Sequence, residues 1–193
     1  MNLKSICGIA AIALAFSFAR ADDPLRFYAS FDSGFVPEIA LDGTKVIKIP
    51  EPAPLKIEGN FGGALAFRQN SGVGDLWYSL GSAMPDSGWT VSFWINPDKT
   101  RSGDKHRSVF RTNFGWNSGN VYVQFDRWGK LNATYIDENK NYRGLDVSEF
   151  SFPAGEWTHA ALVYDGKGMK LFINGNEAVY NRNDGGKIGA PQR

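Results

Sequence analysis

Aromatic rings and amides recur in this chain at positions where they could hold a neutral ligand. Trp94 lies in the segment WTVSFWI, and Tyr122 and Gln124 alternate with apolar residues in VYVQF. Trp116 and Trp128 lie in the turn-like segments FGWNSGN and DRWGK. Aromatic rings can stack on the apolar faces of sugars, and amides can hydrogen-bond sugar hydroxyls. The sequence therefore predicts a carbohydrate-binding surface around Trp94, Tyr122 and Gln124, rimmed by Trp116 and Trp128.

Two further observations bear on this surface. Other residues in phase with the ligand candidates carry hydroxyls or amides, namely Thr90, Ser92, Asn132 and Thr134. An aromatic and amide surface favours sugar, whereas an aliphatic patch would favour protein. A structural interpretation also stays open, because tryptophan is largely buried in most proteins. In it, Trp94 packs beneath a covering loop and Trp128 folds back over a sheet edge.

The acidic residues are not spaced for glycoside hydrolysis. That reaction needs two carboxylates roughly 5–10 Å apart across the scissile bond. On a strand they must be an even number of residues apart to share a face. Asp137 and Glu138 are adjacent, and Asp146 and Glu149 are three apart, so neither pair qualifies. We therefore predict a non-catalytic chain, and keep a glycan-active enzyme as an alternative.

The first 21 residues have the pattern of a secretory signal peptide. An apolar run follows Lys4, and small residues at Ala19 and Ala21 predict cleavage after Ala21. Cleavage removes Cys7, the only cysteine, and two of the 21 basic residues. The remaining basic residues are outnumbered by the 20 acidic residues, so the net charge of the mature chain is near −1. We expect a protein that is secreted, periplasmic or held in the cell envelope, with no nucleic-acid partner and no membrane insertion of the mature chain.

Period-2 alternation of apolar and polar residues dominates the rest of the chain, and it predicts strands with one face in a core. The clearest segments are 25–31, 89–95, 121–125 and 131–135, with shorter ones at 64–67, 76–80 and 109–113. Turn signals separate them, among them Asn174-Gly175, a strong hairpin signal. The proline-rich segment Ser33–Asn60 is predicted as a long connection with one edge strand near Val46–Ile49. The sequence thus indicates a single all-β domain over residues 22–193, an antiparallel sandwich or jelly roll.

Three motifs appear in an order typical of one family. They are GGALAFRQNSG, WTVSFWINP and FPAGEWTHAALVYDGKGMKLFINGNEAV. Together they resemble the laminin-G-like domain of the concanavalin A-like lectin/glucanase superfamily, over about Leu25 to Tyr180. The resemblance implies a two-sheet jelly roll with one concave sheet. Members include lectins, carbohydrate-binding modules, adhesion domains and some enzymes, so a protein-protein or adhesion domain of the cell envelope remains an alternative to glycan binding.

The resemblance also bears on metal and histidine chemistry. Laminin-G-like domains often hold one calcium ion, and Asp32 stands where many relatives have an acidic residue after the first strand. The alternative is a plain turn cap at Asp32, since no Asp-x-Asp-x-Asp spacing supplies the six to eight oxygens that calcium prefers. His159 falls within the family's Trp-Thr-His pattern. It is predicted to be structural, because nothing nearby completes a catalytic triad.

The C-terminus departs from the family pattern. Members continue past the Asn-Gly hairpin into a return strand, whereas this chain ends at Arg193 shortly after GGKIG. We therefore expect a C-terminally truncated domain that lacks its final return strand, with an exposed sheet edge.

Overall fold

The computed structural model describes residues 25–40, 45–67, 76–79, 88–97, 107–112, 120–126, 130–137, 139–146, 152–166 and 168–182. These stretches form strands and turns, and none of them lies in a helix that could cross a bilayer. The all-β antiparallel fold predicted from the alternation is confirmed. The predicted signal peptide and the residues after Arg182 lie outside the described part of the chain, so the predicted lack of a final return strand stays a prediction.

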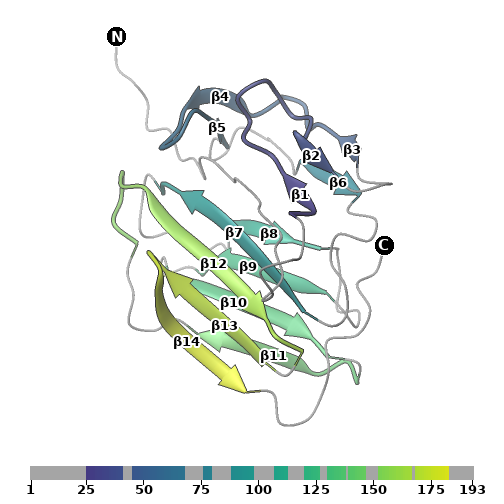
Figure 1. Ribbon diagram of the computed structural model, residues 1–193, viewed down its shortest axis with the longest axis vertical. Coiled ribbons are helices and arrows are strands. Elements are labelled where there is room, and N and C mark those ends of the chain that lie inside the picture. The colour runs from purple at the N-terminus through teal and green to yellow at the C-terminus, as the bar shows by residue number, and fades with distance from the viewer. Residues whose placement is uncertain are drawn as a thin grey trace.

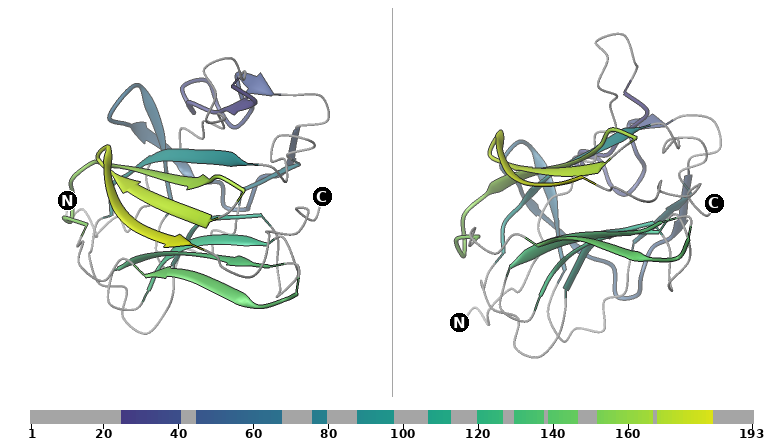
Figure 2. Two further views of the ribbon diagram at one scale, coloured as in Figure 1. Left: turned by 60° about the horizontal axis from the view of Figure 1, so that its bottom comes forward. Right: turned by 90° about the horizontal axis from the view of Figure 1, so that it is seen from below.

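Two four-stranded antiparallel sheets face each other. The first, called here the β7 sheet, has the order β14-β13-β12-β7 and consists of β7 (Trp89–Ile95), β12 (Thr158–Tyr164), β13 (Gly168–Ile173) and β14 (Asn176–Arg182). The second, the β9 sheet, has the order β11-β10-β9-β8 and consists of β8 (Arg107–Arg111), β9 (Val121–Phe125), β10 (Leu131–Ile136) and β11 (Tyr142–Asp146). Figure 2 shows them as two stacked layers, and Figure 1 shows their strands.

The core lies between these layers, and alternate residues of β7, β9, β10, β12 and β13 enter it. β7 and β12 alternate strictly between buried and half-buried side chains. Phe93, Phe125 and Leu162 are fully buried in the same cluster. Burial of each such side chain stabilises the fold by about 1.5–3 kcal/mol, so the alternation fixes which face of every strand points inward. The predicted Asn174-Gly175 hairpin is confirmed, since both residues have positive φ, 48° and 80°.

The N-terminal part adds three two-stranded sheets at one end of the molecule (Figure 1). They pair β1 (Phe27–Tyr28) with β2 (Ile39–Ala40), β3 (Lys45–Lys48) with β6 (Trp77–Ser79), and β4 (Leu55–Glu58) with β5 (Gly63–Ala66). The alternation predicted for residues 25–31 holds only in part: Phe27, Ala29 and Phe31 are buried and Tyr28 is half-buried, but Ser30 is buried as well, and β1 is short. Phe31 has a φ of 65°, which breaks the extended backbone.

The prediction for Ser33–Asn60 is wrong in part. Its edge strand near Val46 is present as β3, but β2 and β4 also form in this segment. Pro52 and Pro54 precede β4 rather than interrupting it, and a proline ahead of a strand removes no hydrogen bond from the ladder. Proline density was therefore a poor guide here to where pairing stops.

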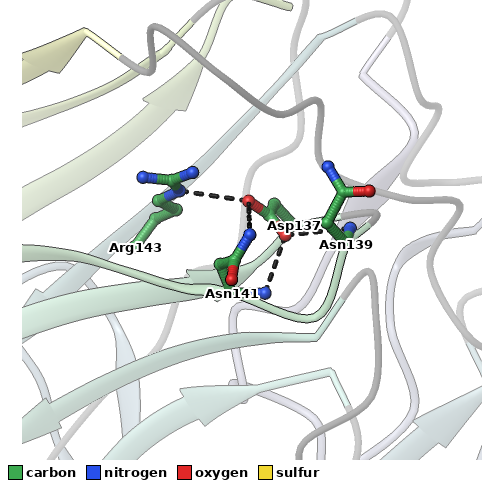
Figure 3. A network of polar contacts seen from close by, with 4 residues as sticks. All are labelled: Asp137, Asn139, Asn141 and Arg143. Atoms are coloured by element: carbon green, nitrogen blue, oxygen red, sulfur yellow. Dashed lines mark hydrogen bonds and ion pairs between the residues drawn. The ribbon is translucent and has the colours of Figure 1, made fainter.

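The turn between β10 and β11 is closed around the buried carboxylate of Asp137 (Figure 3). Its two oxygens accept hydrogen bonds from the backbone N–H groups of Asn139 and Asn141, at 2.9 and 2.7 Å, and from the Asn141 amide at 3.2 Å. Arg143 Nε adds an ion pair at 3.1 Å. Burial alone would raise the pKa of Asp137, but these bonds outweigh burial and hold the pKa below its ordinary value. Asp137 is therefore a structural acid that fixes this turn.

Asp32 ties the segment after β1 to the β4–β5 hairpin. Its Oδ1 accepts a hydrogen bond from the Gly63 N–H, and its main-chain carbonyl accepts one from Lys56 Nζ at 2.8 Å. Its own N–H donates to Ser30 Oγ at 3.1 Å. Oδ1 and the main-chain carbonyl of Asp32 thus already have protein donors, one of them a cation.

Replacing Asp137 by Asn should make the fold less sensitive to acid. The lowered pKa of Asp137 means that its stabilisation is present above the unfolded value near pH 4 and is lost as pH falls through the folded value. We expect Asp137→Asn to cost about 1–3 kcal/mol at pH 7, and to flatten the fall in stability between pH 4 and pH 2. Urea unfolding across this pH range measures both effects. Glu156→Gln, at an exposed carboxylate, is the control, and equal acid sensitivity of both variants and wild type would contradict the role given to Asp137.

Calcium should not stabilise the protein through Asp32. A bound ion would raise the melting temperature by mass action and a chelator would lower it. Because Gly63 and Lys56 already donate to Oδ1 and to the main-chain carbonyl of Asp32, we expect scanning calorimetry to give the same melting temperature with calcium and with EDTA. Asp32→Ala should lower the melting temperature in both conditions. A rise with calcium that Asp32→Ala abolishes would restore Asp32 as a metal ligand.

Candidate functional site

The structure does not bring the predicted ligand residues onto one surface. Trp94 is on β7, whereas Tyr122 and Gln124 are on β9 in the opposite sheet. All three alternate with core residues, so each faces outward, and the outer faces of the two layers point in opposite directions. Trp116 and Trp128 lie outside the described residues, in the segments before and after β9. The expectation of a single surface joining Trp94 to Tyr122 and Gln124 therefore needs correction.

The outer face of the β9 sheet gathers polar and aromatic side chains in register. Tyr122 lies opposite Thr134, and Gln124 lies opposite Asn132. On the next strand Gly144 lies opposite Thr134. We call this surface the tyrosine face, and define it by Asn120, Tyr122, Gln124, Asn132, Thr134 and Tyr142. Arg111 of β8 lies opposite Tyr122 at one side of it.

Two tyrosines on this face are held by their hydroxyl groups. The Asn120 amide donates a hydrogen bond to the Tyr122 hydroxyl at 3.2 Å, and Thr134 Oγ1 donates to the Tyr142 hydroxyl at 2.8 Å. Asn120 and Thr134 are both buried, although they are on the side of their strands away from the core. Each phenol is thus fixed at its polar end to a buried partner, and this fixes the orientation of the ring.

Tyr142 is the most exposed aromatic ring of the tyrosine face, at 55%. Its ring lies across Gly144, two residues further along β11, where a Cβ atom would stand only 3.0 Å from Cε1 of Tyr142. The missing side chain at Gly144 therefore lets the ring lie low over the strand and beside Thr134. The sequence analysis did not identify Tyr142, although a tyrosine two residues from a glycine in one strand could have signalled it.

Asn132 adds an unsatisfied acceptor to this face. Its Oδ1 is shielded from solvent and has no hydrogen-bond partner within the described part of the chain. Buried amide oxygens are nearly always bonded to protein or to ordered water. Its position opposite Gln124 puts two amides side by side on neighbouring strands. The face thus combines anchored rings, amides and one acceptor without a protein donor.

The surroundings of Trp94 are of a different kind. Its ring lies 5.3 Å from that of Phe61, at the tip of the β4–β5 hairpin, and 5.2 Å from that of His159 on β12. His159 Nε2 and Ser92 Oγ are 2.7 Å apart, and burial lowers the pKa of His159. Trp94 is half-buried under the hairpin, as the structural interpretation of this residue expected. Phe61, at 73% exposure, is the ring that meets solvent.

The described residues do not assemble a catalytic centre. Ser92 and His159 have the separation of a nucleophile and a base, but the contacts described for His159 include no carboxylate to orient the imidazole. Asp137 is fully engaged in its turn. In the part of the chain that the structure describes, three or more acidic, histidine or cysteine side chains never come together as metal ligands would.

Comparisons with known proteins agree on the fold. The binding domain of Paraclostridial Mosquitocidal Protein 1 superposes with a TM-score of 0.64 at 14% identity, and the alignment covers 93% of this chain and 42% of that one. Domain 4 of AbnA, a GH43 extracellular arabinanase from Geobacillus stearothermophilus, solved in complex with arabinotriose, gives a TM-score of 0.52 at 16% identity, covering 95% of this chain and 81% of that one. At these identities the likeness shows the fold alone. No curated protein matches the sequence.

A family model extends the likeness to sequence. The laminin G model described as the concanavalin A-like lectin/glucanases superfamily matches residues 71–190, which include all eight strands of the two main sheets. With more than half of its length matched and the two-layer fold in place, this chain belongs to the concanavalin A-like lectin/glucanases superfamily.

Proposed function

We propose that the mature chain is a secreted, non-catalytic module that binds a neutral oligosaccharide on the tyrosine face. The observation that carries the proposal is the pair of tyrosines whose hydroxyls are bonded to the buried Asn120 and Thr134. A ring that is already fixed loses little conformational entropy when a sugar stacks on it. The neighbouring amides of Gln124 and Asn132 supply donors and acceptors for sugar hydroxyls.

The geometry favours a chain of sugars over a single one. Tyr122 and Tyr142 are on β9 and β11, with β10 between them. Two strand spacings separate these strands, roughly 10 Å. A ligand that contacts both tyrosines must extend across β10 and past Thr134, which requires more than one pyranose or furanose ring.

Two further points support the proposal. The arabinanase domain of similar fold was solved in complex with arabinotriose, so this fold accommodates a neutral oligosaccharide in at least one other protein. The N-terminal segment has the charge and hydropathy pattern of a signal peptide, and polysaccharides are encountered outside the cytoplasm. Apart from Arg111 at its border, the residues of the tyrosine face are uncharged, which suits a neutral ligand.

Replacing Tyr142 by Ala should weaken binding with little effect on the fold, because the side chain is 55% exposed. We expect a loss of roughly tenfold or more in affinity, equivalent to about 1.4 kcal/mol. Tyr142→Phe keeps the ring but loses the bond from Thr134 that fixes its orientation, so its affinity should fall between that of the Ala variant and that of wild type. Affinity electrophoresis in gels that contain arabinan, xylan, glucan or mannan measures the effect. Equal retention of the Ala variant and wild type on every polysaccharide that wild type binds would move the site elsewhere.

The two tryptophans predicted to rim the site give a second test. They lie outside the described residues, but the chain positions of Trp116 and Trp128 place them in the segments that flank β9. If they border the tyrosine face, Trp116→Ala with Trp128→Ala should abolish retention on an insoluble polysaccharide. Circular dichroism of the double variant checks the fold. Unchanged retention would restrict the site to the described residues.

A protein-binding role is the second candidate, and one observation favours it. Of the large hydrophobic side chains that are exposed in the described part of the chain, all except Tyr142 lie between residues 36 and 61. This region is more aliphatic than the tyrosine face, and includes Val36, Ile39 and Ile47. If the chain binds none of the polysaccharides and releases no reducing sugar from them, this region becomes the better candidate for a binding surface.

A further inference from the structure

Residues that lie opposite one another on neighbouring strands of the β9 sheet form rows across the tyrosine face. One row, called here the aromatic row, joins Tyr122 to Thr134 and Thr134 to Gly144. The ring of Tyr142 lies across Gly144 at the end of this row. A ligand that contacts both tyrosines therefore runs along the aromatic row and crosses the strands.

A second row, called here the polar row, lies beside the first. It joins Ser108 of β8 to Gln124 of β9, and Gln124 to Asn132 of β10. Gln124 and Asn132 are each two residues from their neighbours Tyr122 and Thr134 in the aromatic row, which is roughly 7 Å along a strand. Side chains two residues apart on a strand point to the same side of the sheet. The polar row therefore flanks the aromatic row on the outer face.

The polar side chains of this surface differ in what they bond. Asn120 and Thr134 are committed to the hydroxyls of the two tyrosines, as described above. In contrast, no other described residue forms a hydrogen bond with the side chains of Ser108, Gln124 or Asn132. Ser108 is exposed and the two amides are half-buried. The residues that hold the rings are thus separate from those whose donors and acceptors are uncommitted.

Uncommitted amides in a half-buried position need an explanation, because such groups are nearly always bonded to protein, water or a ligand. The acceptor of Asn132 is the clearest case, since its Oδ1 is also shielded from solvent. Rotation about the Cβ–Cγ bond, which has a broad minimum, can turn either end of this amide toward a ligand. Bonds to a ligand would therefore satisfy groups that the protein leaves unsatisfied.

The position of the polar row determines which part of a sugar it can meet. A sugar that stacks on an aromatic ring turns its apolar face to that ring, and its hydroxyls project sideways. A chain of sugars along the aromatic row thus has the hydroxyls of one edge beside Gln124 and Asn132. Each amide has an N–H donor group and an oxygen acceptor, so the pair can bond neighbouring hydroxyls.

We infer that the polar row determines the specificity of this site, and that the ligand is a linear polysaccharide whose hydroxyls along one edge carry no side chains. The inference rests on the proposed function, because it takes the aromatic row as the place where the sugars stack. A substituent on those hydroxyls removes the O–H group and leaves Gln124 and Asn132 unpaired. Sites that hydrogen-bond a hydroxyl strongly reject ligands that lack it.

Matched pairs of polysaccharides test this inference with the full mature chain. Each pair contains an unsubstituted and a side-chain-substituted polymer of one type of backbone sugar: linear and branched arabinan, xylan and arabinoxylan, mannan and galactomannan, β-glucan and xyloglucan. Affinity electrophoresis gives a dissociation constant for each polymer. We expect wild type to bind the unsubstituted member of one pair roughly tenfold more tightly than the substituted member.

Gln124→Ala and Asn132→Ala remove the amides. Each should weaken binding of the unsubstituted polymer roughly three- to tenfold. In the double variant the preference within the pair should fall to roughly twofold or less. The melting temperature should stay near that of wild type, because neither amide has a described protein partner, whereas a structural role would lower it. Gln124→Glu keeps the size of the side chain and loses only its N–H donors, so it should show the same direction of effect.

Asn139→Ala is the matched control. The amide of Asn139 is exposed and lies in the turn between β10 and β11, outside the tyrosine face, so this variant should bind both polymers as wild type does. A loss of preference in Asn139→Ala equal to that in the polar-row variants would contradict the inference.

The outcomes distinguish the inference from the proposed function. If wild type does not prefer the unsubstituted polymer, or if the double variant keeps the preference, the polar row is refuted, and the proposed function stands where Tyr142→Ala still loses binding. If Tyr142→Ala binds as wild type while the polar-row variants lose the preference, stacking on Tyr142 is refuted and the polar row stands. If wild type binds none of the polymers, both are refuted.

Discussion

The hydrophobic core takes one face of β7, β9, β10, β12 and β13, and this constraint determines where anything else can bind. A side chain on a strand has only two directions available, and Phe93, Phe125 and Leu162 fix the inward one. Trp94 and Tyr122 are both forced outward by the same rule. Because they belong to different layers, the rule that exposes them also separates them. A continuous site across both is excluded by the packing of the core.

The two outer faces use different means to hold a ring. On the tyrosine face, hydrogen bonds from Asn120 and Thr134 anchor the phenols of Tyr122 and Tyr142. On the other face, Phe61 has no polar atom, and its position comes from the turn between Gly59 and Gly62 and from contact with Trp94. On the tyrosine face the anchoring residues and the amides belong to the same sheet, so polar groups lie beside each ring.

Sequence patterns were informative where local rules dominate. The alternation in WTVSFWI and VYVQF gave the correct inward and outward residues, because burial of one face is a local period-2 property. Asn174-Gly175 gave its hairpin for the same reason. The assignment of strands to layers was not accessible in this way, since it depends on pairing over long sequence separations. The alternation marks both Trp94 and Tyr122 as outward-facing residues. Only the strand order shows that they are on different sheets.

Two exposed aromatic residues were missed for specific physical reasons. Tyr142 follows an asparagine-rich segment, and the ion pair of the buried Asp137 with Arg143 that closes a tight turn there could not be read from composition. Phe61 directly follows the segment Ser33–Asn60, whose prolines suggested an unpaired connection. Its exposure follows from the hairpin between β4 and β5. In both cases the sequence shows the type of the exposed residue, but it does not show the turn that fixes where the neighbouring strand begins.

Gly144 has a consequence for how such a surface could diverge among related sequences. The ring of Tyr142 lies low only because position 144 lacks a Cβ atom, which would otherwise stand 3.0 Å from Cε1. A change to alanine needs one nucleotide substitution in a glycine codon, and it would push the ring up from the strand without touching the core. The orientation of an exposed aromatic ring can thus be altered by a change outside the hydrophobic core. Selection could then retune ligand preference at a position that makes no contact with the ligand.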